Sequence, residues 1–596
     1  MFQTFEVKAR PEQGPPRLAA LRVQMAAAGL DGFIVPRSDA HQGEYVAARD
    51  ARLAWLTGFT GSAGFCVALA DVAGVFIDGR YRTQVKAQVA DVYTPVHWPE
   101  VSLAAWLRQQ LPAGGRVGFD PWLHTVDQIA QAQKALNGSG IDLVKTDNLV
   151  DAIWEDQPAP PMAPAKVHPL EFAGEPHEAK RARLAQTLVE TGARAALITL
   201  PDSICWLLNI RGADIERNPV VHGFAILHSD ATVDLFSEPS KFAGLADHLG
   251  PDVRLRSPAL FLDAVAALAG PVRIDAATVP QIVADRLGDA AVHGTEPCAL
   301  PKACKNTAEI EGAAQAHLRD GAAMVEMLCW LDAQPAGSIT ETQVVTQLET
   351  LRRRDNGLQD ISFETIAGTG PNGAIMHYRV TEETDSLLED GHLLVLDSGG
   401  QYLDGTTDIT RTIAIGTPPR DACEAFTRVL AGMIAMSRLR WPAGLAGSHI
   451  EAVGRMPLWL AGQDFDHGLG HGVGAYLSVH EGPQRLSRIS HVPLEPGMIL
   501  SNEPGYYREG AFGIRIENLL VVQKAAPLPG GDDTREMLDW RTLAFAPIDR
   551  RLILPKMLDS GARDWLNSYH AEVKTKIAPR VSEAAKQWLD AATAPL

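Results

Sequence analysis

The sequence predicts an α/β and α+β protein with three domains: two related α/β units followed by a larger, strand-rich C-terminal domain. Three observations support this prediction. The chain has 596 residues, more than one hydrophobic core normally accommodates. Helical and strand-like patterns alternate in the first half and recur further along it. From Ile361 to about Val522, short strands rich in Ile, Val and Thr and punctuated by glycines replace that pattern.

Composition and charge are those of an ordinary globular protein. Hydrophobic residues make up 46% of the chain and charged residues 21%, which disfavours disorder and fibrous repeats. The formal net charge of −18 produces a field that repels nucleic acid and anionic membranes. The start, MFQTFEVKARPEQGPP, has no apolar signal-peptide region, and no run of about eighteen apolar residues occurs. We therefore expect a cytoplasmic protein without nucleic-acid or membrane partners.

The cysteines are scattered along the chain and form no CxxC pair. This spacing favours reduced, buried thiols over a disulfide framework or a zinc ribbon. The six are Cys66, Cys205, Cys298, Cys304, Cys329 and Cys423.

The first domain, residues 1–153, alternates as βαβ architecture does. The helical pattern RLAALRVQMAAAG precedes the apolar runs DGFIVP and GFCVALA. Further on, ARLAQTLVETG leads into ARAALITLP and WLLNIRG in the same order. Gly29 and Gly192 occupy matching positions in the two passages, and so do Trp55 and Trp206. We therefore predict a duplicated N-terminal half.

The segment EDQPAPPMAPAKVHP indicates a linker, because its prolines stiffen the backbone and remove amide donors. It begins the second α/β domain, residues 154–302. The third domain, residues 303–596, begins near LPKACKN, whose Asn306 is spaced with Glu309 as a capping box. This pattern predicts a long helix that continues through Trp330.

Two more helical regions are expected in the third domain. One follows Thr340 and ends at LRRRDNG, whose three arginines we interpret as a solvated helix terminus rather than an anion site. The other is the C-terminal tail, with Trp565, Leu566 and Tyr569 on one apolar face. That face is expected to pack on the domain or on a partner subunit rather than on a membrane.

Two aspartates lie in the run HLLVLDSGGQYLDGTTDITRTIAIG, which predicts two strands joined by a glycine-rich turn. Asp397 ends the first strand and Asp408 lies inside the second, so an antiparallel pair would bring them together. A carboxylate in so apolar a setting is costly unless it is charge-paired or metal-bound. By itself this segment still favours a turn-capping role, because aspartate in hairpins most often caps turns.

The stretch HGLGHGVGAYLSVHEGP contains three histidines, His467, His471 and His480, among glycines that permit close backbone approach. It lacks the Lys and Ser/Thr of a Walker motif, which disfavours phosphate binding. Each histidine, taken alone, could also be a hydrogen-bonded strand residue.

Two glutamates follow in apolar strand contexts, Glu503 in LSNEPGYY and Glu517 in GIRIENLLVV. Arg515 lies two residues before Glu517, and side chains two apart on a strand share a face. Arg515 therefore either orients a neighbouring metal-binding carboxylate or forms a salt bridge with Glu517 itself.

Four carboxylates and one imidazole are a donor set suited to a pair of divalent ions such as Mn²⁺ rather than to a thiolate zinc site. Four negative charges against two divalent cations leave the cluster near neutral. Two such ions lower the pKa of a bound water toward about 7 and polarise a carbonyl, which is hydrolase chemistry.

These residues lie in DSGGQY, TTDITRT, HGVG, NEPGYY and GIRIEN, which resemble the ligand motifs of the pita-bread metallopeptidases. Within that family, IAGTGPNGAIMHY, GHGVGAYLSVHEGP and EPGYYREGAFGIRIEN resemble the long, three-domain Xaa-Pro aminopeptidases of the aminopeptidase P type. The resemblance implies two creatinase-like α/β domains followed by a pita-bread catalytic domain. It also implies release of the N-terminal residue from peptides with proline in second position, by a dimetal-bound hydroxide that attacks the Xaa-Pro bond.

The same resemblance implies roles for individual residues. Two divalent ions, Mn²⁺ by first expectation and Zn²⁺ or Co²⁺ as alternatives, would be bound by Asp397 (one ion), His471 and Glu503 (the other), and Asp408 and Glu517 (both). Glu503 would also manage the proton of the bridging water. His377 would steady the developing oxyanion, His480 would contact substrate near the scissile bond, and His467 would line the proline-side pocket.

Prolidase, which takes dipeptides, shares this metal set, but the VHEGP and EPGYY passages and the long N-terminal half favour the aminopeptidase. Relatives that lost the ligands serve as chaperones or metal-free amidinohydrolases, and all five ligands remain here. Departures such as HYRV and Leu469 affect subsite shape rather than ligands. The resemblance alone implies a homodimer.

Overall fold

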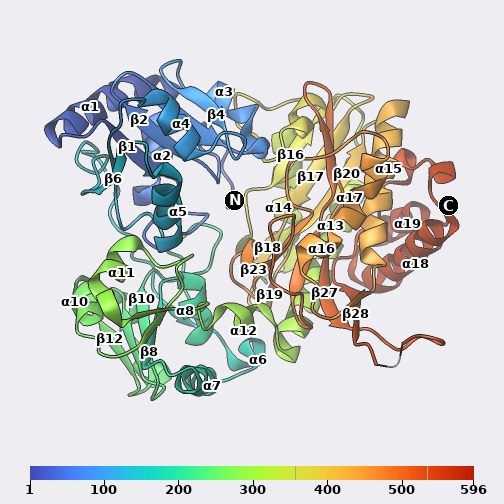
Figure 1. The fold of residues 1–596 in the computed structure, drawn as a ribbon. Helices are drawn as coiled ribbons and strands as arrows, with labels where there is room; N and C mark the ends of the chain where they lie inside the picture. Colours follow the sequence, from blue (N-terminus) through green and yellow to red (C-terminus); the bar gives the residue numbers. More distant parts are fainter. Residues whose placement is uncertain (356, 533) are drawn as a thin grey trace. The chain divides into compact units, whose positions relative to one another are not determined.

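The computed structural model describes residues 1–355, 357–532 and 534–596. The chain divides into two compact units (Figure 1). The N-terminal unit comprises Lys8–Leu170 and Glu175–Ala299. The C-terminal unit comprises Met1–Val7, Glu171–Gly174 and Leu300–Leu596. The predicted domain boundaries near residues 153 and 302 stay predictions.

The first half of the N-terminal unit is a six-stranded sheet of order β4-β3-β2-β1-β5-β6. Its strands are β1 (Gly32–Pro36), β2 (Phe65–Leu69), β3 (Ala73–Ile77), β4 (Thr94–His97), β5 (Gly115–Phe119) and β6 (Ile141–Lys145). Its helices are α1 (Gly14–Ala27), α2 (Arg52–Thr57), α3 (Gln84–Gln88), α4 (Leu103–Gln110) and α5 (Val126–Leu136). Alternate residues of β1, such as Phe33 and Ile34, enter different hydrophobic clusters, so the sheet is buried on both faces.

The second half of that unit is another six-stranded sheet, of order β12-β11-β10-β8-β13-β14. Its strands are β8 (Ala195–Ile198), β10 (Phe224–His228), β11 (Val233–Phe236), β12 (Val253–Arg256), β13 (Val272–Ile274) and β14 (Ala291–His293). Its helices include α7 (His177–Glu190), α8 (Pro201–Leu207), α10 (Phe261–Ala266) and α11 (Gln281–Leu287).

The two sheets have the same topology. In each, the first strand pairs antiparallel with the second and parallel with the fifth, and the third pairs parallel with the fourth. Gly29 and Gly192 follow α1 and α7 with φ of 64° and 74°, a left-handed conformation that glycine adopts without strain. Trp55 and Trp206 lie in the equivalent helices α2 and α8. The predicted duplication is therefore confirmed.

The C-terminal unit contains six helices that matter for its core. They are α13 (Thr307–Asp332), α14 (Glu341–Arg352), α15 (Arg420–Ser437), α17 (Ala452–Trp459), α18 (Ser560–Ile577) and α19 (Glu583–Ala592). The capping box is present at the start of α13: Asn306 Oδ1 accepts from the Glu309 amide at 3.1 Å, and Glu309 Oε2 accepts from the Asn306 amide at 2.9 Å. The prediction of this helix and of one after Thr340 is confirmed.

Two sheets of the C-terminal unit provide the segments of chemical interest. One has the order β16-β17-β20, and the other β21-β28-β27-β24-β22-β23. Their strands are β16 (Ile366–Thr369), β17 (Leu393–Ser398), β20 (Ile409–Ala414), β21 (Trp441–Pro442), β22 (Gly470–Gly472), β23 (Glu481–Leu486), β24 (Ile499–Asn502), β27 (Asn518–Lys524) and β28 (Met537–Thr542). Smaller pairings join β15 (Leu358–Ile361), β18 (Gly400–Tyr402) and β19 (Gly405–Thr406), and β25 (Gly505–Arg508) with β26 (Phe512–Arg515).

Helix α15 lies within the region that the sequence predicts as strands. Phe426, Leu430 and Met433, spaced three or four residues apart, are fully buried in the main core of this unit. That spacing is the signature of one face of an amphipathic helix. The strand prediction is therefore wrong for this segment, because its many apolar residues follow the helical period.

Arg352 corrects the interpretation of the LRRRDNG segment. Its side chain is buried, and Nε and Nη2 donate to the two carboxylate oxygens of Asp320 at 2.7 and 2.9 Å. Nη2 also donates to Ser398 Oγ at 3.0 Å. Arg353 and Arg354 are exposed, as predicted, so the expectation of a solvated helix terminus is wrong for Arg352 alone.

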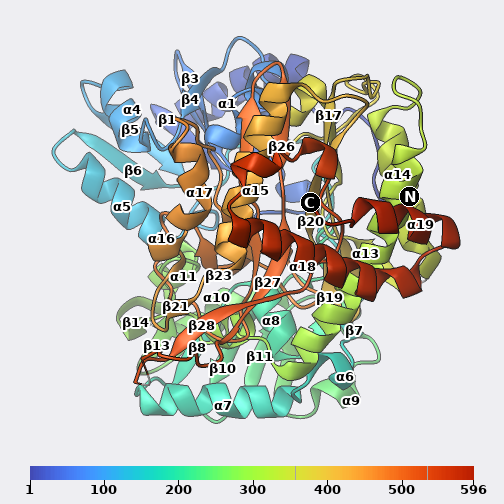
Figure 2. The ribbon, with the colours of Figure 1, turned by 90° about the vertical axis from the view of Figure 1, so that its right-hand side faces the viewer.

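The C-terminal tail folds as predicted. In α18, Leu566 and Tyr569 are buried and Trp565 stacks on Tyr569 with ring centroids 5.2 Å apart. Figure 2 shows α18 crossing α13 and α15, against which it packs. The apolar face is therefore covered by the unit itself. Among the described residues, no helix combines the length and apolarity needed to cross a membrane.

All six cysteines lie in the described residues and are free thiols. Cys66, Cys205, Cys298 and Cys423 are buried, whereas Cys304 and Cys329 are partly exposed. The prediction of reduced thiols is confirmed, and that of burial holds for four of the six.

Candidate metal centre

Strands β17 and β20 bring the two predicted aspartates together. Asp397 lies in β17 and pairs in register with Thr410 of β20. Asp408 precedes β20, which begins at Ile409, rather than lying inside it. Burial raises the pKa of Asp408 well above its usual range, and the neighbouring carboxylates of Asp397 and Glu503 raise it further.

His471 lies in β22, beside β24, and Glu503 directly follows β24. The Nε2 atom of His471 lies 3.5 Å from Asp408 Oδ2 and 3.4 Å from Glu503 Oε1. Its Nδ1 lies 2.9 Å from the carbonyl oxygen of Gly472. Because a carbonyl can only accept, Nδ1 bears the proton in the neutral ring and Nε2 presents a lone pair to the two carboxylates. The lone pair and the two carboxylates repel one another, and a cation bound between them would attract all three groups.

Glu517 joins the cluster from the turn between β26 and β27. Its amide donates to the Thr410 carbonyl at 3.1 Å, and Thr410 Oγ1 donates to Glu517 Oε2 at 2.7 Å. Ligand atoms of Asp408, His471 and Glu517 all lie within 4.8 Å of one another. Burial and then the charges of Asp408, Glu503 and Asp397 raise the pKa of Glu517 well above its usual range.

Three carboxylate oxygens test whether the site fits cations. Asp397 Oδ1, Asp408 Oδ1 and Glu517 Oε1 are buried and have no hydrogen-bond partner within the described part of the chain. Leaving buried carboxylate oxygens unpaired is strongly unfavourable, and clustering four carboxylates adds repulsion. Oxygen-rich donor sets with one imidazole are what hard divalent cations bind. The residues present therefore fit a divalent metal site.

Arg515 pairs with Asp397. Its Nη2 and Nε atoms donate to Asp397 Oδ2 at 2.6 and 3.1 Å. Of the two possibilities for Arg515, orientation of a neighbouring carboxylate agrees with these contacts, whereas the salt bridge with Glu517 does not. Arg515 ends β26 and Glu517 lies beyond it, so the two do not share a strand face.

Tyr507 links Arg515 to His467. Arg515 Nη1 donates to Tyr507 Oη at 2.7 Å, and Tyr507 Oη lies 2.9 Å from His467 Nε2. His467 Nδ1 lies 2.7 Å from the Gly468 carbonyl, so Nδ1 is protonated and Nε2 accepts from the tyrosine. Burial raises the pKa of Tyr507 to about 12, which keeps it a neutral donor. No feature of the sequence distinguishes this tyrosine from its neighbour, since the EPGYY motif contains two.

His480 and His377 border the cluster differently. The His480 ring meets the His471 ring edge-on, with centroids 4.3 Å apart. His377 lies between two anchored neighbours: the Met376 carbonyl accepts from Arg515 Nη1 at 3.2 Å, and Tyr378 Oη donates to Glu341 Oε2 at 2.8 Å. Contacts with Arg515 of β26 and Glu341 of α14 thus anchor the residues on both sides of His377.

Arg411 braces the far side of the cluster. This buried arginine donates to the Glu517 carbonyl at 2.5 Å, to Asn518 Oδ1 at 2.9 Å and to Tyr569 Oη of α18 at 2.8 Å. The C-terminal helix is therefore connected to the segment that presents Glu517. Spacing in the sequence offers no signal for this contact.

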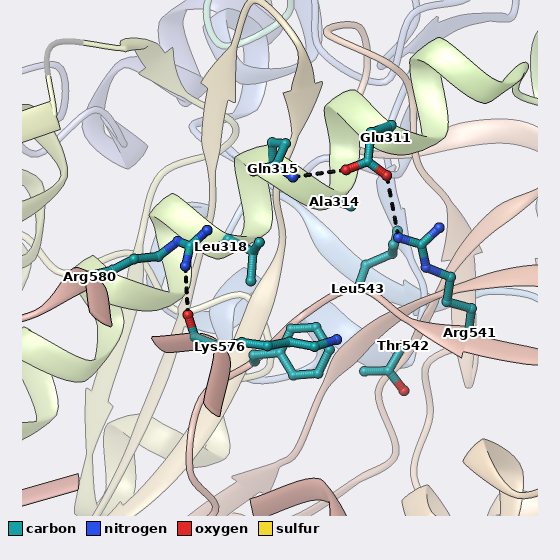
Figure 3. Close-up of a pocket in the computed structure, with 10 residues that line it drawn as sticks. Glu311, Ala314, Gln315, Leu318, Arg541, Thr542, Leu543, Lys576 and Arg580 are labelled. Atoms are coloured by element: carbon teal, nitrogen blue, oxygen red, sulfur yellow. Dashed lines mark hydrogen bonds and ion pairs between the residues drawn. The ribbon is translucent and has the colours of Figure 1, made fainter. Parts of the chain in front are cut away.

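A separate hollow lies between α13, β28 and the end of α18 (Figure 3). The described residues that line it include none of the predicted site residues. Its charged groups are already engaged: Arg541 lies 3.6 Å from Glu311, and the Lys576 ammonium lies 3.9 Å from the centroid of the Phe545 ring. The carboxylate cluster, rather than this hollow, has the features of a catalytic centre.

Family models match four consecutive segments of the chain. Two matches are to the creatinase/prolidase N-terminal domain, at residues 17–153 and 156–309. Metallopeptidase family M24 matches residues 311–524, and the C-terminal region of peptidase M24 matches residues 536–596.

Individual relatives match along nearly the whole chain. Aminopeptidase P2 of Arabidopsis thaliana is 37% identical, covering 95% of this chain and 86% of the relative. A probable Xaa-Pro aminopeptidase P of Talaromyces marneffei is also 37% identical, covering 97% and 92%. The crystal structure of X-prolyl aminopeptidase from Caenorhabditis elegans, described as a cytosolic enzyme with a di-nuclear active site, matches with a TM-score of 0.92 at 30% identity over 98% and 99% of the two chains. The chain belongs to metallopeptidase family M24 and, within it, to the Xaa-Pro aminopeptidases with two creatinase-type N-terminal domains.

Proposed function

We propose that the enzyme releases the N-terminal residue from peptides with proline in second position, using two divalent ions held by the buried cluster. The observation that supports this most directly is the set of unpaired oxygens of Asp397, Asp408 and Glu517, together with the approach of Asp408, His471 and Glu517 ligand atoms to within 4.8 Å of one another. The names of the relatives support proline specificity, and the di-nuclear site of the C. elegans enzyme supports two ions.

In this proposal the five ligands divide between the two ions. Asp397 would hold one ion, His471 and Glu503 would hold the other, and Asp408 and Glu517 would serve both. Bound ions would supply a hydroxide nucleophile and polarise the scissile carbonyl. Mn²⁺ is our first expectation, with Zn²⁺ and Co²⁺ as alternatives, because oxygen-rich sites accept all three.

Glu503 is proposed to manage the proton of the nucleophile. Burial raises its pKa, which favours a carboxylate able to accept a proton and return it to the leaving proline nitrogen. Its Oε1 atom also accepts from Ser501 Oγ at 3.1 Å, which fixes the direction of the carboxylate. Arg515 is proposed to orient Asp397 through their ion pair, leaving the other oxygen of Asp397 for metal.

Three histidines are proposed to act on the substrate. His377 would donate to the developing oxyanion, and His480 would contact substrate near the scissile bond. His467 would line the proline-side pocket, where its hydrogen bond with Tyr507 fixes the ring.

Cellular location, assembly and domain boundaries are proposed from similarity to relatives. A cytoplasmic location is supported by the cytosolic description of the C. elegans enzyme. Peptides are the expected partners, with no nucleic acid or membrane. A homodimer stays a prediction from the family. We propose the domains at residues 1–153, 154–302 and 303–596.

The decisive experiment removes metal and restores Mn²⁺, Co²⁺ or Zn²⁺ singly before assaying three peptides. Arg-Pro-Pro should be hydrolysed, Arg-Ala-Ala should not, and the dipeptide Ala-Pro should be a poor substrate. Preference for Ala-Pro would instead indicate a prolidase. Undiminished turnover in metal-free buffer would rule out the metal-dependent proposal.

A further inference from the structure

A buried triad of charged side chains lies directly beside His480. Glu481, the next residue, contacts both Lys302 and Lys305. We propose that this triad is a positioning device that holds His480 against the metal centre. The inference rests on the proposed role of His480 as a substrate contact.

The triad is fully enclosed within the C-terminal unit. The side chain of Glu481 is 0% exposed, and those of Lys302 and Lys305 are 3% and 1% exposed. The Lys302 ammonium lies 2.9 Å from Glu481 Oε2. The Lys305 ammonium contacts Glu481 Oε1 and also donates to the Lys302 carbonyl at 2.7 Å. Both carboxylate oxygens of Glu481 are therefore held by cations from the segment just before α13.

Stability alone does not explain such an arrangement. Burying two ammonium groups with one carboxylate removes three charges from water, and well-packed apolar residues often replace buried ion pairs without loss of stability. What the triad does provide is a fixed location for Glu481, because Oε1 accepts a hydrogen bond from the Lys305 ammonium and Oε2 lies in an ion pair with Lys302. A fixed backbone at Glu481 constrains the residue before it.

The backbone of Glu481 adjoins the strand that presents His471. Glu481 begins β23 and pairs with Gly472 of β22, at an irregularity between His471 and Gly472. A Cβ atom at Gly472 would lie 2.4 Å from the Glu481 carbonyl oxygen, so the two strands approach unusually closely. The edge-on contact between the rings of His471 and His480 occurs at this point.

His480 lies in the loop between β22 and β23, residues 473–480. The other part of this loop has a different anchor. The Leu477 carbonyl accepts from Gln401 Nε2 at 2.8 Å, and the Leu477 amide donates to Thr406 Oγ1 at 3.2 Å. Strands β18 and β19 thus hold the loop at Leu477. The triad holds it at Glu481, and His480 lies one residue from that second anchor.

The test combines Glu481→Gln with His480→Ala in the full-length, metal-loaded enzyme assayed on Arg-Pro-Pro. Gln keeps the shape of Glu481 but loses the charge that both lysines share. We expect Glu481→Gln to lower kcat at least tenfold, to change KM less than threefold, and to leave the metal content unchanged. In the His480→Ala background, the same substitution should lower kcat by less than twofold further, because the imidazole that the triad positions is no longer present.

A matched control removes a comparable pair from the N-terminal unit. Lys241 Nζ lies 2.7 Å from Asp214 Oδ2, with side chains 4% and 0% exposed. Asp214→Asn should lower the melting temperature without changing kcat more than twofold. If Glu481→Gln does not fold, Lys302→Met leaves one lysine paired with Glu481, and the same non-additivity with His480→Ala is expected.

The outcomes separate the inference from the proposed function. Near-normal kcat in His480→Ala would overturn the role of His480 and the inference with it. A strong loss in His480→Ala combined with additive losses in the double variant would overturn the inference alone. Loss of metal from Glu481→Gln would also overturn it, because the triad would then act through His471.

Discussion

Arg515 and Asp397 form a buried ion pair in which Nη2 lies 2.6 Å from Oδ2, while Oδ1 of the same carboxylate meets no hydrogen-bonding group in the described residues. The arginine thus fixes Oδ2 and leaves Oδ1 without a hydrogen bond. In a metal-binding carboxylate, such a contact sets the direction in which the free oxygen points.

Arg515→Lys should therefore weaken metal binding and turnover together. A lysine cannot reproduce the two-pronged contact with Asp397 or reach Tyr507 at the same time. We expect about a 10- to 100-fold loss in kcat/KM or metal affinity, measured by peptide assay and by metal analysis after dialysis. Arg508→Lys is the control. Arg508 lies on the same β25–β26 hairpin and forms an exposed ion pair with Asp421 of α15, so this variant should have near-normal kcat/KM and metal affinity. Equal behaviour of the two variants would contradict the role of Arg515.

Asp408→Asn should have opposite effects on the metal-free and metal-loaded proteins. Without metal, the substitution removes a buried carboxyl group whose raised pKa destabilises the fold once the unfolded chain ionises it, so the melting temperature at neutral pH should rise. With metal, a ligand is lost and turnover should fall about a thousandfold or more, since several kcal/mol of transition-state stabilisation depend on the ions. Differential scanning fluorimetry with and without chelator, alongside the peptide assay, measures both.

The control for Asp408→Asn is Asp404→Asn. Asp404 pairs with Arg319 at a partly exposed site in the same region of the chain, and its replacement should leave turnover near normal. A metal-free Asp408→Asn protein less stable than the metal-free parent would contradict the claim that the Asp408 carboxyl destabilises the fold in the absence of metal.

Metal binding should release protons. Burial and neighbouring carboxylates raise the pKa of both Asp408 and Glu517 well above their usual range, so the metal-free cluster holds protons to a higher pH than ordinary carboxyl groups do. A divalent cation favours the ionised forms and displaces those protons, so affinity should rise with pH. Titration calorimetry in buffers of different ionisation enthalpy should report about one proton or more released per chain. Proton uptake, or heats independent of buffer, would argue against this account.

His570 should make the enzyme sensitive to acid. Burial, assisted by Arg411 and Arg550, lowers the pKa of His570 to about 3, and its Nε2 accepts from the Ile548 amide at 3.1 Å. Between pH 6.5 and 3 the unfolded chain takes up a proton that the folded chain refuses, so stability falls as pH falls, by up to about 1.4 kcal/mol per pH unit. His570→Gln can still accept from Ile548 and should flatten that slope. Parallel denaturation curves at pH 7, 6 and 5 for the two proteins provide the measurement, and identical slopes would exclude His570.

The periodic and capped parts of the fold could be predicted because their signals are local. Asn306 and Glu309 form a capping box within four residues, and the echo of Gly29 in Gly192 marks equivalent helix ends. Helix α15 was missed because its apolar residues are also good strand formers, and only the three-to-four-residue spacing of Phe426, Leu430 and Met433 distinguishes the helix.

The candidate site, like the fold, could be predicted only in part. The sequence predicts five metal ligands, and the fold brings three of them, Asp408, His471 and Glu517, within reach of one another. It could not predict that Arg515 faces Asp397 rather than Glu517, since strand alternation stops where β26 ends. Arg352 was misread because helix-end arginines usually point to solvent, whereas this one finds Asp320 across the core.

The hydrogen bonds of Arg411 connect helix α18 to the proposed metal site. One guanidinium joins the Glu517 carbonyl to Tyr569 Oη, so removal of α18 would leave a buried positive charge without one of its partners, beside a residue proposed to bind metal. Proteolysis or early termination before α18 is thus expected to disturb the proposed metal site as well as the packing of the helix.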